Sequence, residues 1–140
     1  MERIARIRER LQAEGADVFL ISSPVNRRYL TGFTGSAGLV WVSRTKQAIL
    51  TDFRYLEQVK AECPGWELVR IENYIDALDE LIKEENVSSI VFEEEHVTVK
   101  QLRDWQERFS SVELKGRSGW VEQLRMRKTP EEIENIRKAA

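Results

Sequence analysis

The sequence predicts an α/β fold, a three-layer sandwich in which a mixed sheet of about six strands carries helices on both faces. Two observations carry this prediction. Segments with helical periodicity alternate with short β-prone runs along most of the chain. Two of these runs, at residues 38–43 and 46–51, are separated only by Arg44 and Thr45, which indicates a hairpin. An antiparallel hairpin makes the sheet mixed rather than purely parallel.

The chain begins with a predicted helix, a strand and a second helix. Residues 2–14 repeat apolar side chains at helical spacing, and Gly15 follows as a stop signal. Residues 17–22 form a short apolar run, which is typical of a strand buried on both faces. We expect a short helix at residues 24–30, because Ser23 can serve as its N-cap and a proline occupies its first position.

The middle of the chain continues this alternation after the hairpin. A helical pattern that begins at residue 55 ends at Pro64, and residues 66–71 then alternate as a strand does. Asn73 can cap the next helix, whose apolar stripe runs to a predicted end near Asn86.

The last elements complete the predicted sandwich. Residues 89–92 and 112–114 read as strands, and residues 99–109 form a helix between them. Residues 117–126 predict a final helix, although Gly119 lowers its helical propensity.

The carboxy end differs from the rest of the chain. No repeat or linker divides residues 1–125, which we interpret as one domain. The segment Thr-Pro-Glu-Glu at residues 129–132 is a capping box, and the helical pattern after it continues to Ala140 without a stop signal. We therefore expect residues 126–140 to be a junction and the truncated first helix of a following domain.

The composition argues against several classes of partner. The chain has 22 basic and 24 acidic residues in no block of like charge, so we expect no nucleic-acid partner. Its apolar runs are far shorter than the roughly 20 residues of a membrane span. The amino terminus has no apolar signal core, and the single cysteine, Cys63, cannot form an internal disulfide. These features predict a cytoplasmic protein in which Cys63 is a buried apolar residue.

A glycine-rich stretch is the most informative part of the sequence. Gly32, Gly35 and Gly38 recur at every third position and permit backbone conformations that are closed to other residues. A phosphate-binding loop is disfavoured, because the dinucleotide fingerprint and the Gly-Lys-Ser/Thr ending are both missing. A simple turn remains an open interpretation. Phe33, however, lies where such a turn prefers small polar residues, so we predict an exposed, mobile ring that faces another domain or subunit.

Residues 26–38 read Asn-x-x-Tyr-Leu-Thr-Gly-Phe-x-Gly-Ser-x-Gly. This pattern resembles the signature of the amino-terminal domain of the creatinase/prolidase/aminopeptidase P family of Xaa-Pro peptidases. The segment Leu-Thr-Asp-Phe-Arg-Tyr at residues 50–55 is similar to a second family segment. Residues 124–140 are similar to the junction with the family's pita-bread catalytic domain, although Arg127 stands where the family often has an aliphatic residue.

The resemblance implies a non-catalytic domain that shapes substrate access and subunit assembly in a homodimer or higher homo-oligomer. In the family, two divalent ions (manganese, cobalt or zinc) are held by the carboxy-terminal catalytic domain, and a metal-bridged hydroxide attacks the carbonyl before proline. None of those ligands maps onto this chain. The resemblance therefore implies that the fragment binds no cofactor and is inactive alone, while its parent hydrolyses proline-containing peptides. A free-standing binding module of the same fold is the alternative.

The predicted site has two parts. The substrate-access or interface loop comprises Gly32, Phe33, Gly35, Ser36 and Gly38. The second part is Arg54, with Asp52 and Tyr55 in support. Asp52 and Arg54 have two open interpretations. They can form a charged pair in which Asp52 caps a helix, or Arg54 can offer a planar cation to a substrate carboxylate.

Two further groups of residues receive structural interpretations. The segment Glu-Glu-Glu-His at residues 93–96 contains the only histidine, and adjacent residues at a strand end point in alternating directions. We interpret this segment as a solvated acidic loop rather than a metal site. Of the four tryptophans, at least three are predicted to pack in the core.

Overall fold

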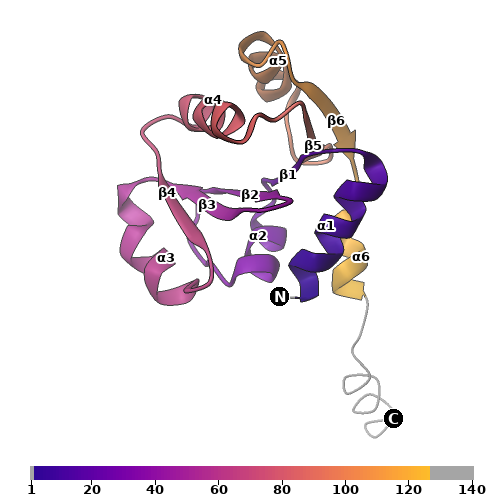
Figure 1. Ribbon diagram of the computed structural model, residues 1–140. Coiled ribbons are helices and arrows are strands. Elements are labelled where there is room, and N and C mark those ends of the chain that lie inside the picture. Colours follow the sequence, from indigo (N-terminus) through magenta and orange to yellow (C-terminus); the bar gives the residue numbers. More distant parts are fainter. Residues whose placement is uncertain (1, 127–140) are drawn as a thin grey trace, which may run out of the picture.

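The computed structural model describes residues 2–126 (Figure 1). The helix expected at residues 129–140 and almost all of the expected junction lie outside these residues.

A six-stranded sheet forms the middle layer, with strand order β4-β3-β2-β1-β5-β6 (Figure 1). The strands are β1 (Val18–Ile21), β2 (Leu39–Ser43), β3 (Gln47–Thr51), β4 (Glu67–Arg70), β5 (Ser89–Glu93) and β6 (Glu113–Arg117). The β2–β3 pair is antiparallel, which confirms the predicted hairpin. Strand β2 is also antiparallel to β1, whereas the other three pairings are parallel. The predicted mixed sheet is therefore confirmed.

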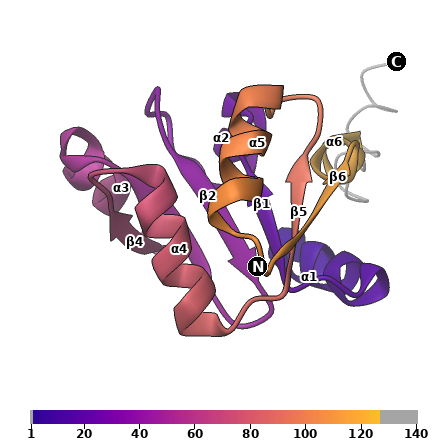
Figure 2. The ribbon, with the colours of Figure 1, turned by 90° about the horizontal axis from the view of Figure 1, so that it is seen from above.

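Helices cover both faces of this sheet. Helices α4 (Tyr74–Glu85) and α5 (Val99–Arg108) pack on one face (Figures 1 and 2). The opposite face carries α1 (Glu2–Glu14), α2 (Pro24–Thr31), α3 (Leu56–Glu62) and α6 (Trp120–Met126) (Figure 1). A short 3₁₀ helix, η1 (Phe53–Tyr55), precedes α3. This arrangement confirms the three-layer sandwich.

The strand alternation divides the apolar core between the two faces. Phe19 and Ile21 of β1 face α1 and α6, whereas Val18 and Leu20 face α4 and α5. Successive side chains of a strand point to opposite faces, so β1, whose four residues are all buried, contributes side chains to the apolar core on each face of the sheet. The predicted burial of Cys63 and of at least three tryptophans is also confirmed, and the structure buries all four tryptophans.

The predicted N-caps Ser23 and Asn73 are confirmed. Ser23 Oγ accepts a hydrogen bond from the Asn26 backbone N–H at 3.4 Å, and Asn73 caps α4. Thr98, which was not among the predicted caps, caps α5. Two boundaries were wrong: β6 ends at Arg117 rather than at residue 114, and α6 begins at Trp120 rather than at residue 117. The physical reason is that β6 extends to Arg117, and Gly119, with φ 83°, then turns the chain through the left-handed region before α6.

The topology brings the two segments of the predicted site to one edge of the sheet. Every strand except β2 runs in the same direction, so five strand ends and the start of β2 lie at a common edge. Ligand sites of α/β sheets form at this carboxyl edge.

No helix within residues 2–126 is long and apolar enough to cross a membrane.

Candidate functional site

Residues 32–38 connect α2 to β2, and close approaches of the backbone explain their glycines. Gly32 ends α2 in the left-handed conformation, with φ 81°, and its N–H donates to the Arg28 carbonyl at 2.8 Å. A Cβ atom at Gly35 would collide with the Phe33 ring. A Cβ at Gly38 would lie 3.2 Å from the Leu50 carbonyl oxygen, which is also tight.

The prediction of an exposed Phe33 ring was wrong. Its side chain is 1% exposed and belongs to the core on the α1 face. The ring meets Tyr55 edge to face, with centroids 5.8 Å apart. Gly35 and Gly38 let the backbone fold directly over the ring, so here the glycines serve close packing. The role of this loop in substrate access or at an interface stays a prediction.

Hydrogen bonds join this loop to β3, η1 and α3. The Ser36 and Tyr55 hydroxyls share a hydrogen bond. The Thr34 backbone N–H and hydroxyl both donate to the Glu62 carboxylate, and these bonds lower the pKa of Glu62. Thr51 Oγ1 donates to the Ala37 carbonyl at 2.9 Å. The structure thus brings two predicted site residues, Ser36 and Tyr55, into direct contact.

Asp52 and Arg54 form a local charged pair. Asp52 is the N-cap of η1 and accepts the Arg54 backbone N–H at 3.0 Å. Its carboxylate also accepts Nε and Nη2 of Arg54, at 2.9 and 2.7 Å. The capping interpretation is therefore confirmed for η1. These bonds to Arg54 lower the pKa of Asp52, and the Arg54 side chain keeps 58% of its surface exposed.

A buried polar network lies beside this loop, and sequence reasoning missed most of it. Asn26, which is 1% exposed, donates through Nδ2 to Glu93 at 2.5 Å and to Glu122 at 2.9 Å. Its Oδ1 accepts Nη1 of Arg125 at 2.7 Å. The other Glu93 oxygen accepts the backbone N–H groups of Ser22 and Ser23. This network joins the end of β1, the start of α2, the end of β5 and α6.

The interpretation of residues 93–96 as a solvated loop was wrong for Glu93, which is 5% exposed. If this carboxylate turned to solvent, the backbone N–H groups of Ser22 and Ser23 would lose their acceptor, and the Asn26 amide would keep only its bond to Glu122. Glu94, Glu95 and His96 are exposed, as predicted. The available sequence signal was the position of Glu93 directly after a fully buried strand run.

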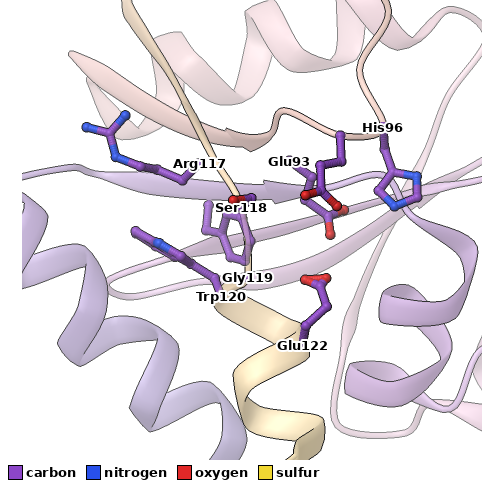
Figure 3. Close-up of a pocket in the computed structure, with 9 residues that line it drawn as sticks. Glu93, His96, Arg117, Ser118, Gly119, Trp120 and Glu122 are labelled. Carbon is purple, nitrogen blue, oxygen red and sulfur yellow. The ribbon is translucent and has the colours of Figure 1, made fainter.

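The carboxylates of Glu93 and Glu122 turn toward one another beside His96 (Figure 3). The space that they border has a volume of about 10 Å³, enough for roughly one water molecule. No group of three or more His, Cys, Asp or Glu side chains within residues 2–126 could hold a metal ion. The described part of the chain therefore does not fit the two-metal ligand set that the resemblance implies.

Comparison with known proteins agrees with this architecture. The family model of the creatinase/prolidase N-terminal domain matches residues 3–127. The chain belongs to this family. The creatinase/prolidase N-terminal domain described above therefore has its signature Asn26 at the centre of the buried network and its signature Phe33 in the core.

Individual relatives show the same relationship. The chain is 34% identical over 139 residues to a protein named "Uncharacterized peptidase YqhT" from Bacillus subtilis, covering 99% of this chain and 39% of the relative. An Xaa-Pro dipeptidase from Bacillus anthracis superimposes with a TM-score of 0.87 and 35% identity, over 96% of this chain and 38% of that chain. The N-terminal domain of cytoplasmic peptidase PepQ from Mycobacterium tuberculosis superimposes with a TM-score of 0.80 and 31% identity, over 88% and 98% of the two chains. The chain thus spans about two-fifths of the first two relatives.

Removing the central amide should destabilise the domain. Hydrogen bonds to charged groups contribute about 1.5–3 kcal/mol each, so we expect Asn26→Ala to cost about 3–5 kcal/mol of unfolding free energy. Urea denaturation measures this. The matched control is Asn73→Ala, which removes an exposed helix cap and should cost about 1 kcal/mol. Equal losses in the two variants would contradict a central role for the network.

The Asp52–Arg54 pair should be visible in a carboxylate titration. Because Arg54 lowers the pKa of Asp52, the pair's contribution to stability is present above the unfolded-state pKa and is lost as the pH falls through the folded-state pKa. Side-chain NMR should find Asp52 titrating below the ordinary range of aspartate. In the Arg54→Ala protein the pKa should return toward that range. An unchanged Asp52 pKa in this variant would show that the pair does not persist in solution.

Proposed function

We propose that the chain is the non-catalytic N-terminal domain of a dinuclear-metal Xaa-Pro peptidase of the aminopeptidase P or prolidase type. The observation that carries this proposal is the family match over residues 3–127, in a chain that spans only 39% of a relative named as a peptidase. In this proposal a carboxy-terminal catalytic domain follows residue 140 and supplies the manganese, cobalt or zinc ligands. The parent enzyme is a cytoplasmic homo-oligomer that hydrolyses proline-containing peptides.

The proposed role of this domain is to shape substrate access and subunit assembly. Support comes from the sheet edge, where a hydrogen bond joins Ser36 to Tyr55 and two hydrogen bonds join Arg54 to Asp52. Next to them, Phe53 is 69% exposed. An exposed aromatic ring beside a fixed cation is suited to contact another domain, a second subunit or a peptide.

Arg54 is the residue best placed to meet a substrate carboxylate. Its pairing with Asp52 uses Nε and Nη2, so the remaining Nη1 can donate to a further acceptor. The pairing also orients the guanidinium before a ligand arrives, which reduces the entropy lost on binding. This second role and the capping interaction are compatible, because they use different nitrogens.

The alternative is a free-standing binding module. Sequencing the gene beyond residue 140 distinguishes it from the peptidase. A following domain that contains two aspartates, one histidine and two glutamates as metal ligands supports the peptidase. A stop codon at this point, or a domain without those ligands, contradicts it. The full-length protein with manganese is then the form in which Xaa-Pro peptide hydrolysis is measured.

In the full-length protein, Arg54→Ala should lower kcat/KM for short Xaa-Pro peptides by about 10- to 100-fold, the equivalent of one charge-assisted hydrogen bond. The fold and the metal content should not change. The matched control is Arg44→Ala, which removes an exposed arginine from the β2–β3 turn. This turn precedes β3, whereas Arg54 follows β3, so the two arginines lie at opposite ends of the strand. An equal loss of activity in the two variants, or no loss with Arg54→Ala, would contradict contact with substrate and leave Arg54 only its pairing with Asp52.

A further inference from the structure

A second pocket at the carboxyl edge of the sheet plays no part in the proposed function. Its volume is about 480 Å³, and it lies where the first turn of α2, the start of β2, α4 and α5 meet. Pro24, Leu39, Ile75 and Trp105 give it apolar walls. The residues Asp52, Arg54 and Tyr55 do not line it. The size is within the usual range of small-molecule sites, which is about 300–1,000 Å³.

Residues with unpartnered buried polar atoms are concentrated around this pocket. Within residues 2–126, four buried side-chain nitrogen or oxygen atoms have no hydrogen-bond partner. Three of them, Ser22 Oγ, Arg27 Nε and Tyr74 Oη, belong to residues that line this one pocket. A buried polar atom without a partner costs about 1–3 kcal/mol, and native domains keep only a few. Because these three atoms belong to residues around one pocket, a single ligand there could supply a partner for each of them.

Arg27 supplies the charge in this group. It is only 5% exposed, and Nη1 and Nη2 donate to the backbone carbonyls of Ser22 and Gly35, at 3.0 and 3.4 Å. These bonds hold the guanidinium in place and leave Nε for another acceptor. No carboxylate of the described residues forms an ion pair with Arg27. Burial lowers the pKa of Arg27 from its ordinary value, and the neighbouring Glu93 carboxylate opposes this shift without forming a direct ion pair. Arginine remains protonated in proteins, so a buried cation borders the pocket.

Tyr74 and Ser22 add neutral donors beside this cation. Tyr74 stands at the first position of α4, and burial raises the pKa of its hydroxyl, which therefore remains a hydrogen-bond donor at neutral pH. Ser22 directly follows β1 and its hydroxyl can rotate toward an acceptor.

We propose that this pocket binds a small organic monocarboxylate, with its carboxylate at Arg27 Nε, Tyr74 Oη and Ser22 Oγ and its apolar body against Ile75 and Trp105. The donor set favours a single negative charge, because one guanidinium is opposed by Asp104 on the same pocket wall. A phosphate dianion would be repelled more strongly by Asp104 and would not use the apolar walls. This site goes beyond the proposed function, since it needs neither the catalytic domain nor a peptide.

The test uses the ¹⁵N-labelled chain and three carboxylates of increasing size: acetate, 3-methylbutyrate and 3-phenylpropionate. We expect saturable shifts at the Ser22, Gly38 and Ile75 amides and at the Arg27 Nε–H group, with affinity rising as the apolar body grows. The neutral analogue 3-phenylpropionamide should bind at least tenfold more weakly than 3-phenylpropionate. The proposal is overturned if none of the three acids gives saturable shifts, if the amide binds equally well, or if inorganic phosphate binds more tightly than the acids.

A pair of tyrosine variants separates binding from folding. Tyr74→Phe should weaken 3-phenylpropionate binding severalfold without loss of thermal stability, because it removes a hydroxyl that has no partner. Tyr29→Phe is the matched control. Its hydroxyl donates to the Leu124 carbonyl at 3.1 Å and does not line the pocket, so binding should not change. Arg27→Met should abolish binding. Unchanged affinity in Tyr74→Phe overturns the proposal, even if Arg27→Met fails to fold.

Discussion

The structure depends most on how one buried carboxylate is satisfied at the end of β5. Glu93 accepts two backbone N–H groups between β1 and α2 with one oxygen and the Asn26 amide with the other. A buried charge without such partners costs several kcal/mol, so the chain on both sides must keep this geometry. Asn26 extends the constraint to Glu122 and Arg125 of α6. The neighbouring elements β1 and α2 are thereby fixed relative to β5 and α6, which lie far away in the sequence.

The fixed start of α2 determines what the rest of the sheet edge can present. Asn26 and Arg27 are adjacent on this helix. Asn26 belongs to the buried network, whereas Arg27 lines the pocket and donates to the Ser22 and Gly35 carbonyls. After α2, the backbone of the glycine-rich loop packs against the Phe33 ring, and the Ser36 hydroxyl forms a hydrogen bond with the hydroxyl of Tyr55 in η1. Ser36 and Tyr55 are thus held in place by a hydrogen bond between segments that are 19 residues apart.

The sequence predicted the sheet, the hairpin, the helix caps and the family, because these depend on local periodicity and on short motifs. It failed where the outcome depends on residues that are far apart in the chain. Phe33 was expected outside because its neighbours are glycines, yet those glycines let the backbone cover the ring. Glu93 looked solvated within an acidic segment, but its partners lie 67 to 71 residues earlier. Arg27 and Tyr74 gave no local signal, since only the fold brings them to one pocket.

Amide hydrogen exchange at Ser22 and Ser23 tests the central claim most directly. Both residues lie between β1 and α2, outside regular structure, and their N–H groups donate to Glu93 at 2.7 and 2.8 Å. If the buried carboxylate holds the edge together, both amides should exchange only through global unfolding, as slowly as the amides of β1. Exchange at the rate of an unprotected loop, in a chain whose β1 amides stay protected, would contradict the account.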